Sequence, residues 1–133
     1  MAEIPPSHRD LFEKKTFAHF ATLMPDGTPQ VTPVWVDYDA ESDHVLVNTA
    51  RGRRKERNVS RDRRVGIEMS DPDDPYRYLS VQGEVVSVSA EGANEHADEL
   101  AGRYMDLDEY PNHGEEQGER VVIRIRPERV IAN

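Results

Sequence analysis

The sequence predicts a mostly β fold with a few helices, built as a small antiparallel barrel of six strands. Apolar runs of strand length recur along the chain, and turns rich in proline, glycine and aspartate separate most of them. Other stretches carry apolar residues at helical spacing, and the chain shows neither an internal repeat nor a linker. Its 133 residues suit one domain, spanning residues 1–133, with a modest core.

Strands are expected at residues 17–24, 30–38, 44–49, 64–70, 76–89 and 120–126. Between the first two strands, Pro25 presets φ and Gly27 accepts a positive φ, so a tight turn is expected there. Pro33 cannot donate to a strand ladder, which predicts a bulge or a sheet edge. Gly83 predicts a bulge in the long fifth strand. Pro127 is expected to end the regular pairing of the last strand.

Helices are expected at residues 7–15, 53–61 and 93–106. In the first helix, Ser7 is the expected N-cap, and Leu11 and Phe12 form the buried side. The third helix carries an apolar stripe at helical spacing, made of Ala97, Leu100, Ala101 and Tyr104. Residues 71–75 and 107–118 are expected to be acidic loops.

The charge of the chain reverses sign over one short segment. Eight of the seventeen basic residues lie between Arg51 and Arg64, where the net charge is +6. The whole chain carries −9, so the remaining residues together carry −15. A run of charge is commonly a solvated helix face that pairs with surface carboxylates, and that interpretation stays open for this segment.

The position of the basic segment favours a second interpretation, a binding site for phosphate. A strand-like run ends near Thr49, Gly52 follows, and the basic helix begins directly afterwards. Backbone N–H groups and the helix dipole then face an anion, and arginine and lysine supply the countercharge. Arg51, Arg53 and Lys55 are the best candidates for the ligand side.

Several function classes are excluded or disfavoured by composition. The chain has no cysteine, and its five histidines lack metal-ligand spacing, so no metal site is expected. The net charge of −9 and the lack of aromatic base readers among the cations argue against nucleic-acid binding. No apolar run reaches membrane-spanning length, and no signal-peptide core is visible, so a cytoplasmic protein is expected. No catalytic residue can be assigned.

The order of the segments resembles that of the split β-barrel flavin and deazaflavin oxidoreductases, which include the pyridoxamine-phosphate-oxidase-like proteins and their F420-dependent relatives. The resemblance rests on residues 17–23 with 26–27, 30–35, 48–58 and 78–84. The third segment is the most specific, because it looks like the family's T-x-x-x-R-x-K-x-x-N phosphate signature. The resemblance implies a six-stranded antiparallel split β-barrel of the FMN-binding type.

The resemblance also implies which residues bind a cofactor. Four residues match phosphate-binding positions: Thr49, Arg53, Lys55 and Asn58. Together with Arg51, which the charge pattern adds, they form the predicted phosphate group.

Two further sets of residues match positions near the cofactor ring. Gln30 and the backbone around Pro33 and Val34 match the strand that lies along the tricyclic ring. Tyr76 and Tyr78 match positions where a partner subunit approaches the cofactor. The family resemblance implies an obligate homodimer with its cofactor sites at the interface.

Composition agrees with a dimer, because 36% apolar residues is low for a self-sufficient monomer. Trp35 is interpreted as a core or dimer-interface residue.

The leading hypothesis is an F420-dependent oxidoreductase that transfers hydride between the deazaflavin and a small conjugated substrate. Five cations within Arg51–Arg57 favour the long acidic tail of F420 over the single phosphate of FMN. An FMN-binding protein of the same fold remains the first alternative, and a non-catalytic carrier of either cofactor is the second.

Overall fold

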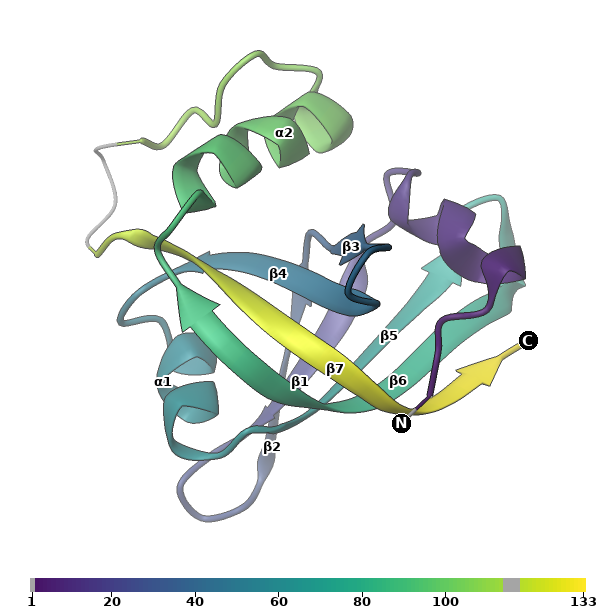
Figure 1. Ribbon diagram of the computed structural model, residues 1–133, viewed down its shortest axis with the longest axis horizontal. Helices are drawn as coiled ribbons and strands as arrows, with labels where there is room; N and C mark the ends of the chain where they lie inside the picture. Colours follow the sequence, from purple (N-terminus) through teal and green to yellow (C-terminus); the bar gives the residue numbers. More distant parts are fainter. Residues whose placement is uncertain (1, 114–117) are drawn as a thin grey trace.

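The computed structural model describes residues 2–113 and 118–133, and within them the chain forms one antiparallel sheet of seven strands with two α-helices and a 3-10 helix (Figure 1). The strands are β1 (Ala18–Leu23), β2 (Pro29–Val34), β3 (Asp37–Asp39), β4 (His44–Ala50), β5 (Arg64–Asp71), β6 (Asp74–Ser89) and β7 (Arg120–Ala132). The helices are η1 (Pro6–Phe12), α1 (Arg54–Arg61) and α2 (Ala93–Met105).

The sheet is curled and remains unclosed. Its strand order is β2-β1-β5-β6-β7-β4-β3, so β2 and β3 are its two edges. Only Trp35 and Val36 separate these two edge strands along the chain. The sheet must therefore curl until its edges lie close together, which leaves a seam at Trp35–Val36. The predicted six-strand barrel is thus a seven-strand open sheet, because the expected strand 30–38 breaks at this seam.

Two predictions from single residues in strands are confirmed. Pro33 lies in the edge strand β2, which pairs only with β1. Its missing N–H therefore removes no hydrogen bond to a second neighbouring strand. The register of β6 against β7 shifts between Gln82 and Gly83. A Cβ at Gly83 would lie 2.6 Å from the carbonyl oxygen of Arg126, so a side chain has no room at this bulge.

The prediction that Pro127 ends the last strand is wrong. β7 continues to Ala132, and its pairing with β6 extends as far as Leu79. Pro127 stands opposite Gly83, at the bulge where the ladder is already interrupted. The proline therefore occupies a position at which its lack of an N–H is tolerated.

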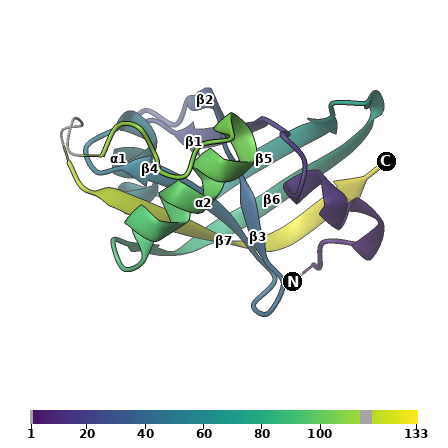
Figure 2. The ribbon, with the colours of Figure 1, turned by 90° about the horizontal axis from the view of Figure 1, so that it is seen from above.

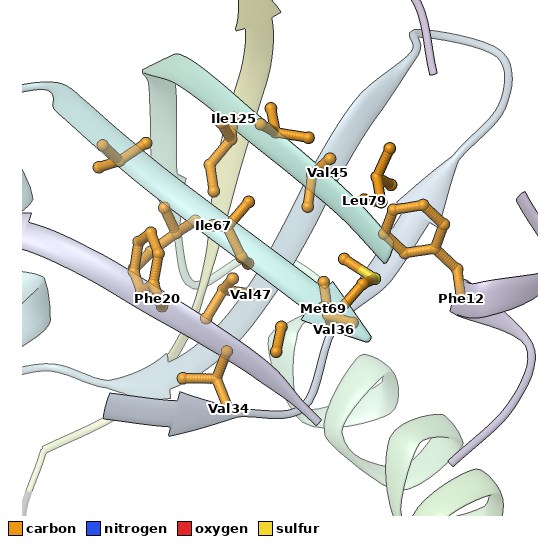
Figure 3. Packing of buried hydrophobic residues seen from close by; sticks show 14 of the residues in the cluster. Phe12, Phe20, Val34, Val36, Val45, Val47, Ile67, Met69, Leu79 and Ile125 are labelled. Carbon is orange, nitrogen blue, oxygen red and sulfur yellow. The ribbon is translucent and has the colours of Figure 1, made fainter. Parts of the chain in front are cut away.

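The core lies inside the curl of the sheet and is closed at one end by η1 (Figure 3). Alternate residues of each strand point inward, as Val45 and Val47 do on β4 and Leu79 does on β6. Phe12 enters the same cluster from η1, as the sequence predicts. This first helix is a 3-10 helix, and its expected N-cap is wrong, because Pro5 takes that place and Ser7 bonds its neighbour His8 instead.

Helix α2 lies on the outside of the sheet, beside β4 (Figures 1 and 2). Leu46 and Val122 point away from the core, because they alternate with core residues, and they pack against Ala93 at the start of α2. The apolar stripe predicted for this helix is buried, and its last member, Tyr104, is 8% exposed. The start of α2 is thereby held against β4 and β7.

Candidate cofactor-binding site

The basic segment folds as the sequence predicts, as a strand, a glycine turn and a helix start. β4 ends at Ala50, Gly52 has a φ of +92°, and α1 begins at Arg54. The positive φ explains the glycine, since other residues rarely adopt it. The first N–H groups of a helix have no intrahelical acceptor, so this end of α1 presents donors and positive dipole toward an anion.

A pocket of about 210 Å³ lies beside this turn. Five of the ten sequence-predicted residues line it: Pro33, Val34, Thr49, Arg53 and Lys55. The other lining residues are Phe17, Trp35, Asn48, Tyr110 and Arg120. The fold thus brings three members of the predicted phosphate group and two residues of the predicted ring-binding strand to one cavity at the seam of the sheet.

The electrostatics of the pocket are those of an anion site. Burial, together with the nearby Arg53 and Arg120, lowers the pKa of the half-buried Lys55 ammonium. Within residues 2–113 and 118–133, the Lys55 ammonium makes no ion pair with a carboxylate. The Thr49 hydroxyl is buried and has no hydrogen-bond partner in the same part of the chain. A phosphate group would satisfy both residues, so they fit the phosphate of a cofactor.

One buried carboxylate stabilises the turn from behind. Glu56 is 7% exposed and accepts a hydrogen bond of 2.8 Å from the backbone N–H of Gly52. Ser60 donates to its other oxygen. Burial works to raise the pKa of Glu56, but the Gly52 N–H and the Ser60 hydroxyl hold it below its ordinary value. Glu56 therefore remains an anion that fixes the glycine turn in shape.

Aromatic side chains form the wall of the pocket that faces α2. Trp35 stacks on Tyr104, with ring centroids 5.1 Å apart, and meets Tyr110 edge-on at 6.2 Å. Phe17, which is 55% exposed, also contacts the Tyr104 ring. The hydroxyl of Tyr104 donates to the Thr16 carbonyl at 2.7 Å, which anchors the wall beside β1. A planar ring would find apolar faces here within reach of cations.

Two predicted residues, Gln30 and Asn58, lie outside the pocket but are linked to each other. Asn58 is fully buried and donates to the Thr22 hydroxyl at 3.0 Å. Thr22 in turn donates to Gln30 at 3.4 Å. This chain of hydrogen bonds ties α1 through β1 to β2, so the two residues connect the helix after the Gly52 turn to the predicted ring-binding strand.

The remaining three predicted residues point elsewhere in this chain. Arg51 forms an ion pair of 2.6 Å with Glu119, which immediately precedes β7. Tyr76 is 83% exposed and Tyr78 is half-buried, and both lie near the start of β6. The structure therefore places these tyrosines away from the pocket of their own chain.

The protein matches a known family along nearly its whole length. A family model described as pyridoxamine 5'-phosphate oxidase matches residues 4–133. The chain belongs to the pyridoxamine 5'-phosphate oxidase family. No curated protein matches the chain.

Solved structures place this family member among related folds. A structure named F420 reductase is 32% identical, with a TM-score of 0.82, and the match covers 96% of this chain and 98% of that one. A conserved hypothetical protein from Mycobacterium tuberculosis is 21% identical, with a TM-score of 0.76 and coverage of 99% and 85%. A putative pyridoxamine 5'-phosphate oxidase from Listeria innocua is 18% identical, with a TM-score of 0.62 and coverage of 87% and 86%. The last two support the fold alone.

In this pyridoxamine 5'-phosphate oxidase family member, sequence reasoning missed five lining residues of the pocket. They are Phe17, Trp35, Asn48, Tyr110 and Arg120. Asn48 stands directly before the phosphate signature, which is a usable local signal. Arg120 reaches the pocket only because β7 pairs with β4, where it stands opposite Ala50.

Neither a metal cluster nor a membrane helix is found in the described part of the chain. Within residues 2–113 and 118–133, no three histidine or acidic side chains gather at metal-binding distance. In the same residues, no helix has the length and apolar character needed to cross a membrane. Residues 114–117 of the expected acidic loop lie outside the described residues.

Proposed function

We propose that the protein is an F420-dependent oxidoreductase that acts on a small conjugated organic molecule. Two neighbouring groups on either side of the glycine turn carry the proposal: the buried Thr49 hydroxyl, which lacks a hydrogen-bond partner in the described residues, and the Lys55 ammonium, whose pKa is lowered by burial and by nearby cations. The 32% identity to a structure named F420 reductase supports the choice of cofactor.

Each part of the site has a task under this proposal. Thr49, Arg53 and Lys55 hold the cofactor phosphate, assisted by the N–H groups of α1. Pro33 and Val34 border the ring from β2, and Trp35 closes the seam behind it. The deazaflavin supplies hydride-transfer chemistry when bound, and the protein supplies grip, orientation and exclusion of water.

FMN is the second candidate cofactor, and the family description favours it. FMN needs one phosphate site, which Lys55 and Thr49 already provide. F420 adds carboxylates beyond its phosphodiester, and the cations around the pocket, Arg53 and Arg120, favour that longer anion. Each added exposed pair contributes only about 0.2–1 kcal/mol, so a preference on the order of tenfold is expected.

Paired titrations of the purified protein with F420 and with FMN, followed by fluorescence, test the cofactor. We expect tighter binding of F420, with an advantage that shrinks as salt rises, because salt screens exposed charge pairs. FMN that binds as tightly as F420 at both low and high salt would replace the F420 proposal with the flavin one. A non-catalytic carrier is distinguished by reduced F420 that binds but is never oxidised by conjugated acceptors.

We also propose a homodimer with its two cofactor sites at the interface. Tyr76 and Tyr78 are cofactor-binding residues only if a second copy brings them to the pocket, and Tyr76 is 83% exposed in the single chain. Light scattering at micromolar concentration is expected to give about twice 15.2 kDa. A monomer that still binds cofactor tightly would remove these tyrosines from the site.

A further inference from the structure

Arg120 is a third cation of the pocket and is held in place on two sides. It lies at the start of β7, lines the pocket and lies close enough to Lys55 to disfavour its charge. Its Nε donates to the Asn48 side-chain oxygen at 2.9 Å. Its guanidinium lies 4.6 Å from the centre of the Tyr110 ring, which is a cation–π contact. Arg120 therefore has a defined position relative to the phosphate turn.

The orientation of the Asn48 amide is fixed by what lies behind it. Its nitrogen donates to the Ala93 carbonyl at 2.9 Å and lies 3.1 Å from Nδ1 of His96. Both of its N–H groups are thus directed toward α2, and its carbonyl oxygen is left for Arg120. An inverted amide would set N–H groups against the Arg120 N–H and an oxygen against the Ala93 carbonyl.

The same order of donors and acceptors continues through His96. Since Asn48 donates to Nδ1, that nitrogen must be the acceptor, and the imidazole proton is on Nε2. Nε2 lies 2.9 Å from Oδ2 of Asp37, whose other oxygen accepts from Arg103 at 3.1 Å. Burial works to raise the pKa of Asp37, but His96 and Arg103 contribute to holding it below its ordinary value. Asp37 is therefore an anion that keeps the proton on Nε2.

We propose that Arg120 binds an anionic group of the ligand, and that Asn48 and His96 are positioning residues that hold Arg120 only while the imidazole is neutral. The inference rests on the proposed cofactor site and adds a proton-dependent control to it. A proton on Nδ1 places two donors face to face, at His96 and Asn48. The amide must then turn or withdraw, and Arg120 loses its hydrogen bond to Asn48 while its contacts with Tyr110 remain.

The charged groups near His96 come from several elements. Asp37 from β3 lies against its Nε2, and Arg103 from α2 shares Asp37 with it. Glu91, before α2, and Arg124, from β7, line the hollow that His96 also borders. These two side chains carry opposite charges. The contact through which His96 acts on Arg120 is the one with Asn48.

Two substitutions of His96 separate a positioning role from a merely structural one. In His96→Gln, the amide oxygen can accept from Asn48 and the amide nitrogen can donate to Asp37, as the neutral imidazole does, but this side chain takes no proton. In His96→Leu, both bonds are lost. Arg120→Gln removes the cation, and Arg126→Gln, on the same strand outside the pocket, is its matched control.

The experiment measures the dissociation constant of F420 between about pH 5 and pH 8, the range in which histidines change charge. We expect wild-type affinity to fall on acidification toward that of Arg120→Gln, which binds about tenfold or more weakly. We expect His96→Gln to keep its affinity across the range, and His96→Leu to bind weakly throughout. Thermal unfolding of each variant identifies any loss that is due to misfolding.

The result that overturns the proposal is an equal acid response in wild type and His96→Gln, or wild-type affinity in Arg120→Gln. Lys55→Met in the same assay separates this failure from that of the proposed function. If Lys55→Met binds weakly while Arg120→Gln does not, the phosphate site stands and only the role of Arg120 is wrong. If neither variant is weakened, the pocket itself is wrongly assigned.

Discussion

Replacement of Lys55 by methionine is expected to have opposite effects on ligand binding and on the stability of the ligand-free protein. Methionine keeps most of the side-chain volume and removes the charge. One lost charge-assisted bond costs about 1.5–3 kcal/mol, which corresponds to a dissociation constant for F420 raised roughly 10- to 150-fold. Titration followed by fluorescence measures this change, and Lys15→Met, an exposed lysine outside the pocket, is the control.

The ligand-free Lys55→Met protein is expected to be as stable as the wild type or more stable by about 0.2–1 kcal/mol, because the burial of a charge and its repulsion by neighbouring cations are both relieved. The sign follows from the lowered pKa of Lys55. The unfolded chain holds this proton more tightly, so the cost to folding is present at neutral pH and fades as the pH rises toward 10.5. Urea unfolding at several pH values measures it. A variant that loses stability while its affinity is unchanged would show that Lys55 has a structural role and would refute the phosphate assignment.

Three further predictions concern the fold that carries the site. A backbone N–H and a lysine ammonium lower the pKa of Asp71 to about 2. The contribution of this carboxylate to stability is therefore present above about pH 4 and is lost as the pH falls toward 2. Asp71→Asn should flatten this acid-side fall in the urea midpoint, and an unchanged fall would contradict the assignment. Gly83→Ala forces a Cβ against a backbone carbonyl and should cost about 1–3 kcal/mol, whereas Gly66→Ala, with 3.9 Å to its nearest neighbours, should unfold close to the wild type in thermal scans. Tyr104→Phe leaves the buried N–H of Val36 without its acceptor and should cost about 1–3 kcal/mol in urea unfolding, and an unchanged midpoint would deny this bond a role.

Local chemistry accounts for what was predictable from the sequence. Pro33 at an edge, Gly83 at a bulge and the buried stripe of α2 each follow from the conformational limits or spacing of a few neighbouring residues. The strand, Gly52 and helix start of the phosphate turn are equally local, and their order along the chain matches their order in space. Thr49, Arg53 and Lys55 were therefore found without a structure.

Contacts between distant segments account for what was not predictable. The break at Trp35–Val36 arises because the two edges of a curled sheet must be joined, and the run 30–38 contains no local stop signal there. Pro127 escapes its usual effect because the bulge at Gly83 lies opposite it. Arg120 and Tyr110 enter the site through pairing and packing across many intervening residues.

The connection between β6 and β7 has a consequence for how such a protein changes over time. The two strands pair directly, and α2 and the segment around Tyr110 form an excursion between them that contributes no residue to this ladder. That excursion supplies Tyr110 and holds Trp35 through Tyr104, while the Gly52 turn with Arg53 and Lys55 lies between β4 and α1. Under the proposed function, substitutions in the excursion can therefore reshape the aromatic wall and change how Arg120 is held, while Thr49, Arg53 and Lys55 stay outside their reach in the chain. The aromatic wall and the proposed phosphate-binding residues are thus encoded in separate stretches of one short chain, joined by Arg120.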